Sequence, residues 1–321
     1  MQNKNKPFLL RPSGKDYLWG GSRLNDEFEK NIDLQPLAET WECSTHPDGP
    51  SYVVGGEFDG KELAEVLKAH PEYLGERHKG ECTLPILIKF IDAKKDLSVQ
   101  VHPTDEYAKD KENGQLGKTE MWYIVDCEEG SQLIYGFDKE ISREEFADRI
   151  KNNTLLEVTN NVPVHKGDVF FIESGTLHAI GKGILIAEIQ QNSNTTYRVY
   201  DYGRVGKDGK PRELHIEKAI DVTELCPPKY DTKPQGKPVK IDGGEETLLR
   251  SCEYFDVHKI KVSGTVTLDA DEKSFMSVLV LDGNGKIGEL DAKKGDSFFV
   301  PAGYGRFTLT GNLEVILSDI V

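Results

Sequence analysis

The chain lacks a hydrophobic run that could cross a membrane: no stretch of its 321 residues approaches the roughly 20 apolar residues that a membrane helix needs. Its first residues also lack an apolar core followed by a small-residue cleavage site, the pattern of a signal peptide. We therefore expect a cytoplasmic protein that does not act at a membrane.

Cysteine pairs and clustered positive charge are also missing. The five cysteines are scattered and form no CxxC motif, which favours neither a disulfide framework nor a thiolate zinc site. Any bound metal must therefore be held by imidazole, carboxylate or amide groups. The formal net charge is −15. Nucleic acid and anionic lipid require clustered Lys and Arg, so neither is an expected partner.

Short β-branched or aromatic runs separated by Gly, Asp, Asn and Pro dominate the sequence. Such runs predict strands, here at residues 51–54, 84–91, 121–125, 131–137, 168–174, 183–190, 277–282, 297–303 and 313–320. Helical patterns are few and lie at residues 61–75, 142–153 and 213–225, with Ser142 as an expected N-cap. Many short strands with few helices are typical of a sandwich or barrel.

An internal repeat indicates a duplicated architecture. Residues 165–175 (HKGDVFFIESG) resemble residues 293–303 (KKGDSFFVPAG), and the copies then diverge to His178 in the first and Arg306 in the second. Only the first copy therefore keeps a metal-binding side chain at this position. A Pro-, Lys- and Gly-rich segment at 226–246 has the composition of a linker. We predict a catalytic domain at 1–235 with helical segments, and a C-terminal β domain at 236–321 without a metal site.

A polar face on one strand is the first sign of a functional site. If residues 97–103 (LSVQVHP) form a strand, alternation places Ser98, Gln100 and His102 on one face and the apolar side chains on the other. Such a face fits a wet cavity or a metal site. An edge strand with one side in solvent is the alternative.

Two further segments supply matching groups. Alternation places Lys118, Glu120 and Trp122 on one face of a strand that continues into an aromatic run, so the carboxylate is expected inside, where a metal would be its partner. His178 follows a later strand and turn. Taken singly, a solvated Lys–Glu pair and a structural histidine are the ordinary explanations. Together, Gln100, His102, Glu120 and His178 form a set that binds a borderline divalent ion and leaves open positions.

A polar loop follows the strand at 183–190. Arg198 and Arg204 lie in it among Asn, Ser, Thr and Tyr residues. Arginine in such surroundings is suited to binding an anion. A polar surface loop with paired arginines is the alternative.

These segments resemble the type I mannose-6-phosphate isomerases (phosphomannose isomerases), in their shorter bacterial form. The resemblance spans most of residues 1–210 and is carried by Trp19-Gly20-Gly21, Ala38–Glu42 with His46-Pro47, Ser98–Pro103, Gly117–Trp122, Gly175–Ala179 and Asn194–Arg204. It implies a mainly β fold of two cupin-like β-barrels of the jelly-roll type with a few helices. It also implies one Zn²⁺ per chain on Gln100, His102, Glu120 and His178, and it places Lys118 and Arg198 where the family has its catalytic or phosphate-contacting residues.

The implied reaction interconverts mannose 6-phosphate and fructose 6-phosphate through a cis-enediol. A metal stabilises negative charge on the substrate oxygen, and a positioned base adds about 10²–10⁴-fold. Lys118 is expected either to transfer the proton or to bind the phosphate, and Arg198 to bind substrate charge. No role is expected for His46, His70, His78, His165, His215 and His258.

Two other functions fit the sequence less well. Another cupin enzyme, such as a glucose 6-phosphate isomerase or a non-haem iron dioxygenase, usually has an H-x-H pair where Gln100 stands here. A non-catalytic sugar-binding cupin usually loses its ligands, as the second repeat has at Arg306. The oligomeric state is left open by the sequence.

Overall fold

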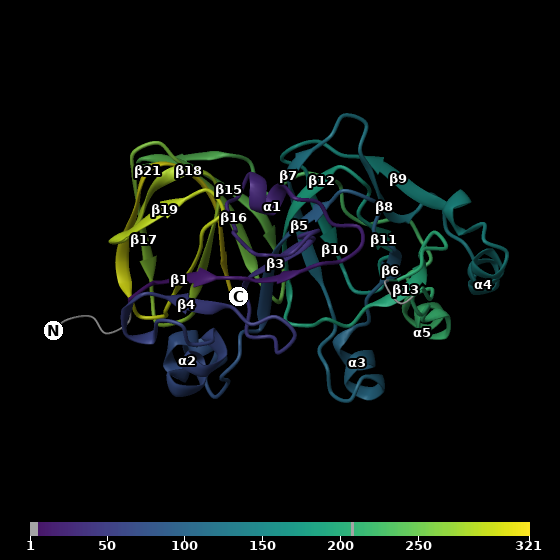
Figure 1. The fold of residues 1–321 in the computed structure, drawn as a ribbon, viewed down its shortest axis with the longest axis horizontal. Helices are drawn as coiled ribbons and strands as arrows, with labels where there is room; N and C mark the ends of the chain where they lie inside the picture. The colour runs from purple at the N-terminus through teal and green to yellow at the C-terminus, as the bar shows by residue number, and fades with distance from the viewer. Residues whose placement is uncertain (1–5, 207–208) are drawn as a thin grey trace.

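The computed structural model describes residues 6–206 and 209–321, and these are mainly β. Their strands form three antiparallel sheets (Figure 1). Each segment that we predicted as a strand contains one, and each predicted helical segment contains a helix. No helix of the described residues is long and apolar enough to span a membrane.

A six-stranded sheet forms the central layer of the larger half of the molecule. Its order is β10-β7-β12-β5-β3-β2. The bounds are Val169–Ile172 for β10, Glu120–Cys127 for β7, Ile184–Gln191 for β12, Ile86–Ala93 for β5, Glu39–Cys43 for β3 and Ser13–Lys15 for β2. Every residue of β12 and β5 is buried, because this sheet is covered on both faces.

A five-stranded sheet packs against one face of this layer. Its order is β13-β6-β11-β8-β9. The bounds are Tyr197–Tyr200 for β13, Val99–Val101 for β6, His178–Ala179 for β11, Gln132–Phe137 for β8 and Thr159–Pro163 for β9. Side chains such as Trp122, Ile186 and Leu133 form the apolar core between the two sheets.

A ten-stranded sheet makes up the other half of the molecule. Its order is β14-β15-β16-β21-β18-β20-β1-β4, with β17 on β21 and β19 on β18. The bounds are Val239–Ile241 (β14), Gly244–Ser251 (β15), Asp256–Val262 (β16), Thr265–Ala270 (β17), Met276–Ile287 (β18), Leu290–Lys293 (β19), Ser297–Val300 (β20), Gly305–Asp319 (β21), Phe8–Arg11 (β1) and Tyr52–Val54 (β4). The first and fourth strands of the chain thus complete the sheet of the C-terminal half.

Helices cover the outer surfaces. The α-helices are α1 (Arg23–Asp26), α2 (Leu63–Ala69), α3 (Asp105–Lys111), α4 (Arg143–Lys151) and α5 (Ile216–Val222), and the 3₁₀ helices are Gly56–Phe58, Pro71–Leu74, Glu76–His78 and Leu155–Glu157. Ser142 caps α4 as predicted, since its hydroxyl accepts a hydrogen bond from the Glu145 backbone N–H. Helix α3 was not predicted, because its polar sequence has no apolar periodicity.

The two copies of the sequence repeat fold alike. In the first copy the backbone N–H of His165 donates to the Asp168 carboxylate at 2.8 Å, and in the second that of Lys293 donates to Asp296 at 2.9 Å. The glycine of each turn, Gly167 or Gly295, has a φ of 93° or 90°, a conformation that favours glycine. Each turn leads into a buried four-residue strand, β10 or β20. The repeat is therefore structural as well as sequential.

The closed barrels implied by the resemblance are not confirmed. The strand orders of the described residues are open paths, and the six- and five-stranded sheets meet through side chains across an apolar core rather than through a closed ring of hydrogen bonds. The predicted linker also contains regular structure, because β14 and the start of β15 lie within residues 226–246. The boundary between 235 and 236 stays a prediction.

A pair of like charges in the C-terminal sheet gives a testable pH dependence. Asp319 of β21 is directly opposite Asp256 of β16. Burial, together with the charge of Asp256, raises the pKa of Asp319 from 3.8 to about 6. The folded protein therefore holds this proton more tightly than the unfolded chain does, so ionisation costs stability as the pH rises from 3.8 to about 6, and the cost persists above that range.

We expect Asp319→Asn to raise the free energy of unfolding at pH 7.5 by about 1 kcal/mol and to change it little at pH 4. Urea denaturation at the two pH values measures both quantities. An equal effect at both pH values would contradict the assignment of the raised pKa to this carboxyl group.

Candidate metal centre

A row of four side chains crosses the inner face of the six-stranded sheet. Glu188 of β12 is opposite both Trp122 of β7 and Lys89 of β5, and Lys89 is opposite Trp41 of β3. The Trp122 indole N–H donates to Glu188 Oε2 at 2.8 Å, and Lys89 Nζ lies 3.2 Å from Glu188 Oε1. At this end of the sheet the buried side chains are charged instead of apolar. We therefore take this end as the location of the candidate site.

Three potential metal ligands meet beside this row. Glu120 begins β7, His178 begins β11, and His102 directly follows β6. Glu120 Oε1 lies 3.4 Å from His178 Nε2 and 3.6 Å from His102 Nε2, and one ligand atom of each residue lies within 4.8 Å of the others. All three residues are buried. The packing of the two sheets therefore brings together groups that are up to 76 residues apart, from 102 to 178.

Hydrogen bonds from Nδ1 to backbone carbonyl oxygens fix the orientation of both imidazole rings. His102 Nδ1 lies 2.9 Å from the carbonyl oxygen of Thr195, and His178 Nδ1 lies 2.8 Å from that of Thr176. A carbonyl oxygen can only accept, so each Nδ1 carries the hydrogen and each Nε2 presents a lone pair toward Glu120. This orientation is usual for histidines that bind a metal through Nε2.

The fourth predicted ligand lies at the edge of the cluster. Gln100 is opposite His178 in the β6–β11 pair, and its Nε2 lies 3.4 Å from His178 Nε2. A half-turn of the side-chain amide exchanges its oxygen and nitrogen. The amide is therefore close enough to take part in the same site.

The protonation states of these groups also suit a cation. Burial, with the nearby charge of Lys118, lowers the pKa of His102 to about 3, and burial lowers the pKa of His178. Burial opposes ionisation of Glu120, but the positive charge of Lys118 is the largest opposing effect, and the pKa of Glu120 lies well below its ordinary value. Neutral imidazoles beside an ionised carboxylate are the forms in which these groups bind metal.

The carboxylate of Glu120 tests whether the residues fit a metal. Both oxygens are buried; Oε2 is paired with the Lys118 ammonium group, whereas Oε1 faces the two unprotonated Nε2 atoms and accepts no hydrogen bond from the described residues. A buried carboxylate in this state is costly unless a positive charge neutralises it. Lys118 lies on one side of it, and the two Nε2 atoms lie on the other. The donor set of one carboxylate, two imidazoles and an amide therefore fits a divalent cation such as zinc.

Lys118 is placed directly against the cluster. Its Nζ lies 2.5 Å from Glu120 Oε2, 3.2 Å from His102 Nε2 and 3.8 Å from Glu188 Oε1. The predicted shared face of Lys118, Glu120 and Trp122 is confirmed by these contacts and by the packing of Trp122 on the His178 ring at 5.3 Å.

A cavity of about 260 Å³ opens beside the cluster. Gln100, Lys118 and Arg198 all line it, so three of the predicted site residues share one space. Arg198 Nη1 donates to the carbonyl oxygen of Glu213, while its buried Nε has no hydrogen-bond partner among the described residues. Leu97 also lines the cavity, contrary to the alternation that we predicted, because β6 begins only at Val99.

Arg204 has a structural position instead of an anion-binding one. Its guanidinium group bonds to the Asp201 carboxylate, with Nη2 and Oδ1 2.5 Å apart, and to the carbonyl oxygen of Asp96. Arg212 shares the same carboxylate, with Nη2 2.6 Å from Asp201 Oδ1, and it also lines the cavity.

No role was predicted from the sequence for four charged residues of this cavity: Glu39, Lys89, Glu188 and Arg212. For Lys89 and Glu188 a signal was present, since Lys89 is the lone basic residue of LPILIKFI and Glu188 the lone charged residue of GILIAEIQ. A charge within an otherwise buried strand indicates a polar site. Arg212 lies in a loop without any such pattern.

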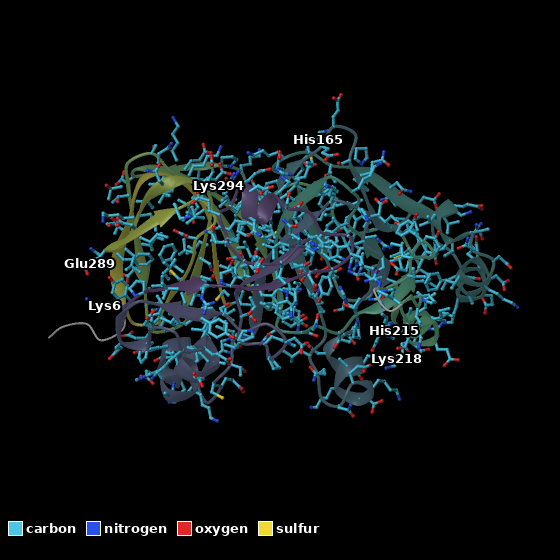
Figure 2. The ribbon with its side chains drawn as sticks, in the orientation of Figure 1. Lys6, His165, His215, Lys218, Glu289 and Lys294 are labelled. Carbon is cyan, nitrogen blue, oxygen red and sulfur yellow. The ribbon has the colours of Figure 1, made fainter. Side chains whose placement is uncertain are left out.

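Among the described residues, the cluster includes no histidine besides His102 and His178. Figure 2 shows His165 at a loop on one edge of the molecule and His215 beside Lys218 near α5. His165 has 80% of its side chain exposed, and His215 Nδ1 accepts a hydrogen bond from the Arg198 backbone N–H at 3.2 Å. His215 therefore supports the strand that carries Arg198.

Comparisons with known proteins agree with this geometry. The family model for the catalytic domain of type I phosphomannose isomerase matches residues 8–131, and that for the cupin domain of mannose-6-phosphate isomerase matches residues 244–320. A mannose-6-phosphate isomerase of Bacillus subtilis is 41% identical over 98% of this chain and 99% of its own length.

Two solved structures have the same fold. The crystal structure of the mannose 6-phosphate isomerase from Bacillus subtilis superposes with a TM-score of 0.91 at 38% identity, covering 98% of this chain and 99% of that one. The enzyme from Salmonella typhimurium, solved with fructose 6-phosphate and zinc, has a TM-score of 0.75 at 18% identity, covering 98% and 99%. The chain belongs to the type I mannose-6-phosphate isomerase (phosphomannose isomerase) family.

Proposed function

We propose that this protein is a metal-dependent aldose–ketose isomerase that interconverts mannose 6-phosphate and fructose 6-phosphate. The observation that carries the proposal is the cluster of His102, Glu120 and His178 beside a cavity lined by Lys118 and Arg198. Full-length relatives are named as this enzyme. The distantly related Salmonella enzyme was solved with zinc and fructose 6-phosphate.

One zinc ion per chain would be held by Gln100, His102, Glu120 and His178. Bound there, zinc supplies Lewis acidity that stabilises negative charge on a substrate oxygen. The protein keeps the two imidazoles neutral and Glu120 ionised. It orients both imidazoles through backbone carbonyl oxygens and encloses them between two sheets.

The cavity resolves the apparent conflict between an acidic protein and an anionic substrate. Although the formal net charge is −15, Lys89, Lys118, Arg198 and Arg212 all line this one cavity. Glu188 lies between the two lysines, and Glu39 lies 3.7 Å from Lys89, so these two carboxylates offset part of the positive charge. Local positive charge attracts a sugar phosphate that the outer surface would repel.

Arg198 binds substrate charge in this account. Its unpartnered Nε and its position opposite Gln100 in the β13–β6 pair make it a donor beside the metal site. A guanidinium group suits a phosphate or an enediolate oxygen.

Lys118 transfers the substrate proton. Its contacts with Glu120 and His102 place its amine beside the metal site, where the reacting carbons must lie, and not at the far end of the substrate. Lys89, which is separated from the metal ligands by Glu188, is the better candidate for the phosphate. The sequence left two roles open for Lys118, proton transfer and phosphate binding. The positions of the two lysines favour proton transfer for Lys118.

The C-terminal half serves as a structural cupin unit in this proposal, derived with the first half from one duplicated ancestor. Among the described residues, no group of metal-binding side chains other than the His102 cluster meets the spacing of a site. Arg306, which replaces the histidine of the first repeat, has 84% of its side chain exposed. The cytoplasmic location expected from the sequence stays a prediction.

Purified protein should convert mannose 6-phosphate to fructose 6-phosphate in a coupled assay. Removal of metal with a chelator should reduce the rate at least about 100-fold, and zinc should restore it, because the Lewis acid is then replaced. Magnesium, which prefers octahedral oxygen ligands, should not restore it. Full activity at negligible metal content would contradict the metal-dependent mechanism, and faster turnover of glucose 6-phosphate would identify a different isomerase.

A further inference from the structure

A second cavity, of about 730 Å³, lies next to the catalytic one. Asn194 lines both cavities, so the two share part of one wall. The second cavity is bounded by loops at residues 45–48, 78–85, 115–116 and 192–195. Its volume is within the range of small-molecule sites, about 300–1,000 Å³.

The chemistry of the second cavity differs from that of the catalytic cavity. No lysine or arginine of the described residues lines it, and Asp48 and Glu81 do. These charges disfavour a phosphate. The remaining lining combines amide, hydroxyl and imidazole groups with apolar side chains such as Leu84 and Leu116. Such a mixture suits a ligand with many hydroxyl groups and apolar C–H faces.

Two polar atoms of the lining residues have no hydrogen-bond partner among the described residues. One is Asn192 Oδ1, and the other is His78 Nε2, and both are buried. The amide of Asn192 is held in one orientation, because its Nδ2 donates to the carbonyl oxygen of Leu84 at 2.8 Å and to Thr45 Oγ1 at 3.3 Å. Asn192 Oδ1 therefore remains an acceptor, and a buried acceptor is costly when it stays unbonded.

The second histidine of the cavity offers a donor. The backbone N–H of Asp48 donates to His46 Nδ1 at 3.1 Å, so the proton of a neutral ring is on Nε2. Burial lowers the pKa of both His46 and His78, which keeps both rings neutral at pH 7. The cavity thus presents neutral donors and acceptors.

We propose that this cavity binds a neutral, hydroxyl-rich molecule, either an unphosphorylated sugar or a polyol. Hydroxyl groups both donate and accept, so they match Asn192 Oδ1 and the two imidazoles, while Leu84 and Leu116 contact the C–H faces of the ligand. This inference goes beyond the isomerase function and does not depend on it.

Occupancy of the cavity is coupled to the metal site through one segment of chain. Thr195 lines the second cavity, and its carbonyl oxygen is the group that orients His102. The neighbouring Asn194, which lines both cavities, donates through Nδ2 to Asp48 Oδ2 at 3.0 Å. A ligand in the second cavity touches this segment and should change the isomerase rate.

Binding can be measured by calorimetry with D-mannose, mannobiose and mannitol, each in the presence of saturating fructose 6-phosphate. We expect at least one probe to bind with a dissociation constant in the millimolar range, both with and without fructose 6-phosphate. Arg198→Ala, which alters only the catalytic cavity, should leave this binding unchanged.

Variants of the second cavity give the decisive comparison. Leu116→Trp, which fills the cavity, and His78→Ala should each weaken binding at least about 10-fold, and His78→Gln, which keeps a polar group, should restore part of it. Leu156→Trp is the matched control, because Leu156 is similarly exposed, at 37% against 42% for Leu116, but lies elsewhere. Thermal unfolding verifies that each variant is folded.

The proposal is overturned if none of the three probes binds to the wild-type protein. It is also overturned if fructose 6-phosphate abolishes binding, since the probe would then occupy the catalytic cavity. Equal affinity in wild type, Leu116→Trp and His78→Ala would place the ligand at a different site.

Discussion

His178→Ala is expected to lose bound zinc and at least about 10³-fold in isomerase turnover, since a metal supplies several kcal/mol of transition-state stabilisation and each 1.36 kcal/mol is worth a factor of ten. The imidazole is fully buried between Glu120 and Trp122, and it offers the cluster one of two Nε2 lone pairs. Without the imidazole, the Glu120 carboxylate loses one neighbour, and the site keeps too few ligand atoms to hold zinc.

The variant should nevertheless fold. Truncation of His178 removes one hydrogen bond to the Thr176 carbonyl oxygen and leaves a small cavity, at a cost of about 1–3 kcal/mol. Metal analysis, turnover and thermal unfolding should be compared with His165→Ala, a histidine of the same chain region whose side chain is 80% exposed. Wild-type zinc content and turnover in His178→Ala would remove His178 from the site.

Arg198→Ala is expected to lower kcat/KM by about 10²–10³-fold and to leave the zinc content unchanged, because a donor to developing substrate charge is typically worth that much. Arg198 lines the cavity with Lys118 and Gln100, but no contact joins its guanidinium group to Glu120 or to either imidazole. Substrate binding and metal binding should therefore separate in this variant.

The matched control for Arg198→Ala is Arg306→Ala. Arg306 has 84% of its side chain exposed and lies in the C-terminal half, so its removal should affect neither zinc nor turnover. Stoichiometric loss of zinc in Arg198→Ala would show that the arginine supports the metal centre. Unchanged kcat/KM would remove it from the catalytic account.

Much of the candidate site follows from local sequence pattern. The period of two in a strand placed Lys118, Glu120 and Trp122 together, and their contacts confirm this face. His178 was selected because it follows a predicted strand and turn and completes a ligand set with Gln100, His102 and Glu120. The assignment of Gln100, His102, Glu120 and His178 as ligands, and of Lys118 and Arg198 as catalytic groups, stays a prediction.

Other features depend on pairings that no local pattern contains. The cross-strand row of Trp122, Glu188, Lys89 and Trp41 requires the register of four strands that are distant in sequence. For the same reason β1 could not be assigned to the C-terminal sheet, where it pairs with β20. Strands of open sheets and of closed barrels have the same alternation of inward and outward side chains. The sequence pattern therefore could not distinguish an open sheet from a closed barrel.

The location of the site is a consequence of how the layers meet. The six-stranded sheet supplies Glu120, while two inner strands of the five-stranded sheet, β6 and β11, carry the two imidazoles at their ends. Between the sheets the core is apolar at Ile184 and Ile186 and becomes charged at Glu188 along a single strand. The candidate metal site therefore lies at the end of an otherwise apolar core.

The most direct measurement is the anomalous scattering of zinc-loaded crystals at the zinc absorption edge. The account predicts one strong peak per chain, at about 2.0–2.2 Å from a donor atom of Gln100, His102, Glu120 and His178. A peak elsewhere, or no peak between these four side chains in protein that is active as an isomerase, would contradict it.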